Sequence, residues 1–118
     1  MDDFSQQIDF LQKHSTYARR WLNARPEWLG WLQSQGQKKV DIQGIKGLLK
    51  DCGVECLADD QDEALWMANL RLARQRLMLW IAFRDLNGMA DLHEVTHALS
   101  HFAELAVSAA IAFIREDL

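Results

Sequence analysis

Residues 66–86 read WMANLRLARQRLMLWIAFRDL, and the seven residues from Leu77 to Phe83 are all apolar. At about 100° per residue these side chains point to every side of a helix, so other helices must surround it. A short apolar run also suits a buried strand, but no Gly or Pro interrupts this stretch, and its other residues favour helix. The stretch predicts a central buried helix from Asp60 to Leu86, with Asn87 and Gly88 as its stop.

The segments that precede this helix carry apolar residues at spacings of three and four, which is typical of amphipathic helices. Residues 4–22 form one helix or two, because Ser15 is able to cap a second one. Pro26 suits the start of a short helix that Gly36 ends, and Asp41 suits the cap of the next helix. The sequence therefore predicts an all-α fold, a small bundle of about five helices around the central one.

The last helix is expected to start after Asp91, with the carboxylate of Glu94 reaching back to the helix start in a capping box. One apolar face is expected to pack inside. Its residues are Leu92, Val95, Leu99, Phe102, Ala106, Ala109 and Phe113. A second strip, rotated by about 100°, needs another partner, and we expect a downstream segment or another subunit to cover it. Its residues are Val107, Ala110, Ile111, Ile114 and Leu118.

The composition of the 118 residues, 49% hydrophobic and 25% charged, suits a single helical domain over residues 1–118. A net charge of −4 gives no basic field for nucleic acid. Cys52 and Cys56 follow no apolar leader, so we expect reduced thiols and a cytoplasmic location. The weakly polar tract from Phe102 to Ile114 is shorter than the ~20 residues of a membrane span. We expect no membrane partner.

His93 to His97 match H-E-x-x-H, the zinc-peptidase pattern. A catalytic zinc needs a third protein ligand, and His101 lies about 12 Å along the helix from His93, too far for one ion. The histidines and Glu104 also lie opposite the expected apolar face, on the solvent side. We therefore predict solvated histidines and no metal site, with incidental zinc or nickel binding at His93 and His97 as the alternative. A zinc hydrolase is not expected.

Arginines gather on the central helix, where they either bind a phosphate or partner carboxylate or pair with acids of this chain. No Gly-rich nucleotide-binding loop and no nucleophile with its base is present, so we predict no catalytic or cofactor-binding residue. The possible interface residues are instead Arg71, Arg74, Arg76, Arg84, Val107, Ile111, Ile114 and Leu118.

Residues 70–86, LRLARQRLMLWIAFRDL, resemble the LR-x-F-RRR-x-ML-R-IA-x-RDL segment of the glutamine synthetase adenylyltransferase/adenylyl-removing enzyme family (glutamate-ammonia-ligase adenylyltransferase). Residues 24–29 are similar to the family's HPEWL corner, and residues 91–105 to its DL-x-EVT-x-x-LS-x-LAE helix. The resemblance runs from about Ser15 to the end. Ala73, Gln75 and Trp80 depart from the family pattern, and the histidines are not part of it.

The resemblance implies a bacterial cytoplasmic nucleotidyltransferase with two activities. One attaches AMP from ATP to a tyrosine of glutamine synthetase, the other removes it with phosphate, and magnesium serves both. PII signalling protein and glutamine set the balance in nitrogen regulation. The family's paired aspartates lie downstream of these residues, so the chain is expected to be a non-catalytic N-terminal fragment beside a downstream nucleotidyltransferase domain. A free-standing helical protein-interaction module is the alternative.

Overall fold

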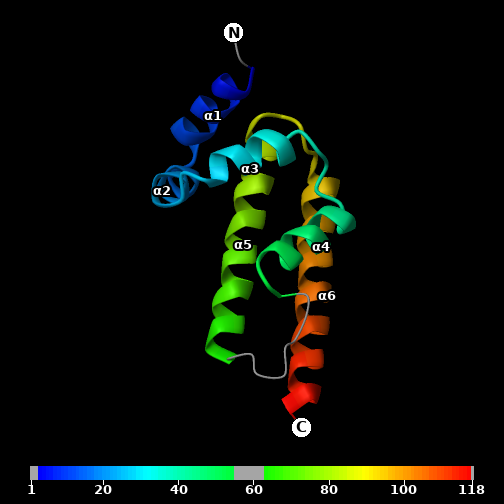
Figure 1. Cartoon of the computed structure of the whole chain (residues 1–118). Coiled ribbons are helices and arrows are strands. Elements are labelled where there is room, and N and C mark those ends of the chain that lie inside the picture. The colour runs from blue at the N-terminus through cyan, green and yellow to red at the C-terminus, as the bar shows by residue number, and fades with distance from the viewer. Residues whose placement is uncertain (1–2, 55–62, 118) are drawn as a thin grey trace. The chain divides into compact units, whose positions relative to one another are not determined.

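The computed structural model describes residues 3–54 and 63–117, with side chains as far as residue 112 (Figure 1). These residues form six helices and no strand, which confirms the predicted all-α bundle. The helices are α1 (Asp3–His14), α2 (Thr16–Ala24), α3 (Trp28–Gln35), α4 (Ile42–Asp51), α5 (Glu63–Leu86) and α6 (Leu92–Asp117). The predicted start of the central helix at Asp60 lies outside the described residues.

Tertiary contacts divide the chain into two compact units. Unit 1 comprises Met1–Val40 and Met78–Val95, and unit 2 comprises Asp41–Leu77 and Thr96–Leu118. Both α5 and α6 contribute residues to each unit. The assignment of residues 1–118 to a single domain stays a prediction.

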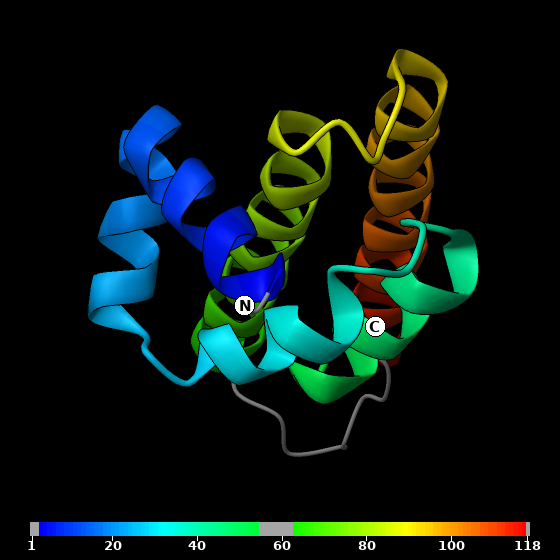
Figure 2. The ribbon, with the colours of Figure 1, turned by 90° about the horizontal axis from the view of Figure 1, so that it is seen from above.

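In unit 1, α1 and α3 pack on the C-terminal part of α5 (Figure 2). The ring of Phe4 lies 5.8 Å from that of Phe83, and the ring of Trp31 meets Trp80 edge-on at 5.9 Å, measured between centroids. Such aromatic pairs add to the free energy of apolar burial. The predicted buried run is largely confirmed, since five of its seven residues are buried and only Met78 and Ala82 are half-buried.

Local capping residues begin and end several helices where the sequence predicts. Ser15 ends the first helix and caps the second, because its Oγ accepts a hydrogen bond from the backbone N–H of Ala18 at 3.0 Å. Asp41 caps α4 through a 2.8 Å bond from the N–H of Gly44. Gly88, with φ of 73°, forms the turn after α5, in the left-handed region that favours glycine. The alternative with two N-terminal helices is therefore the correct one.

In unit 2, α4 packs its apolar stripe inward and lies beside α6 (Figures 1 and 2). Ile45, Leu48 and Leu49 are buried there, as are Trp66 and Ala73 of α5. The spacing of three and four residues predicts an apolar stripe of Ile42, Ile45, Leu48 and Leu49 for this helix. It is confirmed except at Ile42, which is 37% exposed.

The inward face of α6 agrees only in part with the predicted one. Leu92 and Leu99 are 78% and 42% exposed, whereas Glu94 and Ala98 are buried. Successive residues are about 100° apart around a helix, so Leu92 lies about 200° from Glu94. Because Glu94 is held inside by an ion pair, Leu92 must face outward. The other described members of the predicted face, Val95, Phe102, Ala106 and Ala109, are half-buried. Hydrophobic periodicity therefore gave the inward face only in part, and it misplaced Leu92 and Leu99.

Within α6, Leu92–Ala112 is the one described stretch that could cross a membrane by length and composition, with a mean hydropathy of 1.2. This stretch is longer than the weakly polar tract from Phe102 to Ile114, because it extends toward the helix start as far as Leu92. The stretch also includes Glu94 and Glu104, and carboxylates are costly in a bilayer. Glu94 is paired inside unit 1. The absence of a membrane partner stays a prediction.

Candidate functional site

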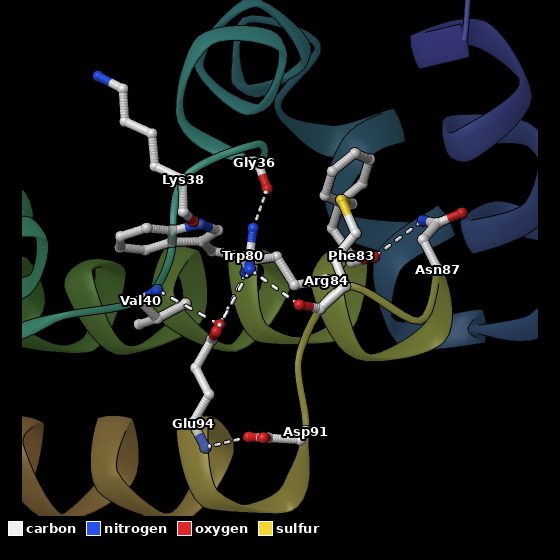
Figure 3. Close-up of polar contacts among 10 residues, drawn as sticks. Gly36, Lys38, Val40, Trp80, Phe83, Arg84, Asn87, Asp91 and Glu94 are labelled. Carbon is white, nitrogen blue, oxygen red and sulfur yellow. Dashed lines mark hydrogen bonds and ion pairs between the residues drawn. The ribbon is translucent and has the colours of Figure 1, made fainter.

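A buried ion pair links the end of α5 to the start of α6 in unit 1 (Figure 3). Arg84 is 5% exposed and Glu94 is 8% exposed. The guanidinium donates from Nε to Glu94 Oε2 at 2.7 Å and from Nη2 to Oε1 at 3.2 Å. This two-pronged arrangement uses the planar fork of arginine, and it pairs two opposite charges that are largely buried.

The same two side chains also bind three backbone groups, which belong to two segments. Arg84 Nη1 donates to the carbonyl oxygen of Gly36 at 3.1 Å, and Nη2 donates to that of Met89 at 2.9 Å. The N–H of Val40 donates to Glu94 Oε2 at 3.3 Å. We call these five residues, Gly36, Val40, Arg84, Met89 and Glu94, the Arg84–Glu94 cluster. It joins the link after α3 to the α5–α6 turn.

Close packing surrounds the cluster. A Cβ atom on Gly36 would lie 2.5 Å from the ring of Phe83, so only glycine lets the backbone approach this ring. Trp80 Nε1 donates to the carbonyl oxygen of Lys38 at 3.3 Å, which fixes a further point of the same link (Figure 3). These contacts hold charge and backbone in place. The cluster is therefore suited to positioning helices and offers no nucleophile or base.

The structure corrects the roles predicted for both charged residues. Arg84, expected among the interface positions, lies inside unit 1 because its guanidinium is bonded within the chain. The carboxylate of Glu94 does not complete the predicted capping box, since it is turned toward Arg84 and Val40. The cap itself is confirmed, since Asp91 Oδ1 accepts a 2.8 Å bond from the N–H of Glu94. That bond lowers the pKa of the Asp91 carboxyl.

A signal for the buried pair was present in the sequence. Arg84 directly follows the apolar run that ends at Phe83, so it continues a stretch that is buried on every side. A charge in such a position needs a buried partner. Which acid supplies that partner depends on the turn between α5 and α6, and spacing alone does not identify it.

The other three arginines predicted as interface residues, all on α5, lie in unit 2 and differ in their surroundings. Arg71 and Arg74 are exposed, whereas Arg76 is half-buried and its Nη1 donates to Cys52 Sγ at 3.6 Å. Burial raises the pKa of the Cys52 thiol, and the charge of Arg76 opposes this rise. Cys52 is a free thiol, as predicted, and Cys56 lies outside the described residues.

The remaining predicted site residues lie on α6. His93 and His97 are exposed, as predicted, but His101 is half-buried. Among the described residues, no group of three or more possible metal ligands is found. Val107 and Ile111 are 57% and 45% exposed, so this part of the second apolar strip lies on the surface. The side chains of Ile114 and Leu118 lie outside the described ones.

Comparison with known proteins gives consistent matches over this chain. The family model for glutamate-ammonia ligase adenylyltransferase matches residues 5–117. The bifunctional glutamine synthetase adenylyltransferase/adenylyl-removing enzyme of Ralstonia nicotianae is 35% identical over 111 residues, which cover 94% of this chain and 11% of the relative. The same enzyme of Aromatoleum aromaticum is 35% identical over 104 residues, 88% of this chain and 10% of the relative. No solved structure matches.

A shorter match agrees with these. The bifunctional enzyme of Thioalkalivibrio sulfidiphilus is 47% identical over 58 residues, which cover 49% of this chain and 6% of the relative. The chain thus spans about a tenth of the length of the first two curated relatives. Because the family match extends over nearly all of its residues, the chain belongs to the glutamate-ammonia ligase adenylyltransferase family.

Proposed function

We propose that this chain is a non-catalytic helical part, N-terminal in the parent enzyme, of a bifunctional nucleotidyltransferase that adenylylates and deadenylylates glutamine synthetase. The observation that carries the proposal is the family match over residues 5–117, combined with coverage of about a tenth of the relatives. The parent would use ATP and magnesium in the cytoplasm and respond to PII signalling protein.

The Arg84–Glu94 cluster supports a structural role for this part. Arg84 lies in the RDL segment and Glu94 in the EVT segment on which the family resemblance depends. Both side chains are used to hold backbone segments together inside unit 1. A structural cluster therefore accounts for Arg84 and Glu94 without any contact to substrate.

Two sets of surface residues suit contacts with the rest of the parent enzyme. About nine-tenths of each relative lies outside its match to this chain. Val107 and Ile111 expose apolar side chains on α6, and Arg71 and Arg74 expose charges on α5. Covering exposed apolar groups with a partner lowers the free energy of the system. We place the contact with the downstream nucleotidyltransferase domain at Val107 and Ile111.

The absence of catalysis is tested with the purified chain. It is incubated with glutamine synthetase, ATP and magnesium, and separately with adenylylated glutamine synthetase and phosphate. Release or incorporation of labelled AMP is measured, with the full-length Ralstonia nicotianae enzyme as the positive control. We expect no turnover above the buffer blank. Turnover by the chain alone would refute the proposal.

The interface is tested in the full-length enzyme that carries this segment. Val107→Asp and Ile111→Asp place a charge on the exposed strip, whereas Ser100→Asp places one at an exposed polar position of the same helix. We expect the two strip variants, but not Ser100→Asp, to increase proteolytic cleavage between this segment and the rest of the enzyme. Equal cleavage in all three variants would place the contact elsewhere.

A further inference from the structure

One polar strip of α6 carries two histidines of unit 2. His97 and His101 lie four residues apart on one helix, followed by Glu104 three residues later. At about 100° per residue the three positions fall within about 60° of one another. No lysine or arginine occurs between Leu92 and Ile114, so no neighbouring cation on the helix opposes a bound metal ion.

The two imidazole rings are close enough to share one metal ion. Their centroids lie 6.0 Å apart. With a metal–nitrogen bond of about 2.0–2.1 Å, each bound ring has its centroid about 3.2 Å from the ion. Two rings on one ion are then at most about 6.4 Å apart, and about 5.2 Å apart in tetrahedral geometry. The observed separation therefore lies within about 1 Å of the spacing that tetrahedral coordination needs.

The enclosed nitrogen of His101 determines which of its ring nitrogens can bind a metal ion. Its Nδ1 is buried and has no hydrogen-bond partner in the described part of the chain. Because Nδ1 is enclosed, Nε2 is the ring nitrogen that would bind the ion, and Nδ1 then carries the proton. A neutral imidazole carries one lone pair, which is the form that coordinates metal.

We propose that His97 and His101 together bind one divalent transition-metal ion of the class that prefers imidazole, zinc or nickel. No third protein ligand belongs to this site among the described residues, so water completes the coordination. Glu104, which is exposed, contributes negative charge one turn away. Two protein ligands make this an exchangeable site, and it is independent of the function proposed above.

The test is isothermal titration of the metal-free chain with nickel chloride and, separately, with zinc chloride. We expect one ion per chain, and at least about a tenfold loss of affinity in each of His97→Ala and His101→Ala, since each removes one of two ligands. His93→Ala should keep the affinity of the natural chain. A Cys52→Ser/Cys56→Ser variant should keep it as well, because the site uses no thiolate.

Two further measurements check where the metal ion binds and whether each variant is folded. Nickel is paramagnetic, so it should broaden the NMR signals of the His97 and His101 rings before those of His14. Circular dichroism establishes that each variant is folded, and the exposed position of His97 makes His97→Ala the safer of the two. Three outcomes would overturn the proposal: His93→Ala losing as much affinity as His101→Ala, binding that survives loss of both proposed ligands, or no saturation below millimolar metal, which indicates an adventitious ion only.

Discussion

Replacement of Arg84 by methionine should strongly destabilise the protein. Methionine keeps much of the volume but removes four hydrogen bonds, two to Glu94 and one each to the carbonyl groups of Gly36 and Met89. Glu94 is then a buried carboxylate without its counter-ion. Breaking a buried pair in this way costs about 3–5 kcal/mol, a large share of the total stability of a domain.

A double-mutant cycle separates the pair from simple loss of volume. Arg84→Met, Glu94→Leu and the double variant are unfolded in urea and followed by tryptophan fluorescence, since Trp80 is fully buried beside the cluster. For Arg84→Met we expect the midpoint to fall by about 2 M. The double variant should be more stable than Arg84→Met, because it leaves no unpaired charge inside. The coupling energy should be about 1–3 kcal/mol.

The matched control is Arg74→Met, which removes an exposed arginine from the same helix. Its free energy of unfolding should stay within about 0.5 kcal/mol of the natural chain. The reasoning fails if Arg84→Met costs less than about 1 kcal/mol or if the two single effects simply add. Either result would mean that Glu94 finds water or another partner when Arg84 is absent.

Three further predictions concern single positions. Gly36→Ala should lower stability by about 1–3 kcal/mol, because its Cβ would clash with the Phe83 ring. Gly47→Ala should raise stability by up to about 1 kcal/mol, because its Cβ would meet nothing within 4 Å. Thermal unfolding of both variants measures the difference. Because the pKa of Asp91 is lowered in the folded protein, its cap stabilises the fold above the unfolded pKa, and this stability is lost as the pH falls through the folded pKa. Asp91→Asn should remove this acid-dependent part of the free energy of unfolding. A variant with an unchanged dependence of stability on pH would contradict the prediction. Because burial raises its pKa, Cys52 should react with iodoacetamide more slowly at pH 8 than a free cysteine, in a variant lacking the other cysteine; an equal rate would show an accessible, ordinary thiol.

The sequence by itself determined the elements. The apolar run from Leu77 to Phe83 points to every side of a helix, so it predicted a helix surrounded by others. Five of its seven residues are buried. Caps at Ser15, Asp41 and Asp91 act within four residues, so their hydrogen bonds follow from local sequence. The family resemblance also follows from the residues in order, because it needs no knowledge of how the helices pack.

Only the tertiary structure decided the rotation of α6 and the role of its charges. Leu92 and Leu99 have the spacing of a buried face, yet both are exposed, because Arg84 holds Glu94 on the opposite side of the helix. Arg84 and Glu94 are ten residues apart across a turn, and Gly36 and Val40 join them from much earlier in the chain. Periodicity describes one helix at a time, whereas the energy of a buried charge depends on groups that only folding brings within hydrogen-bonding distance.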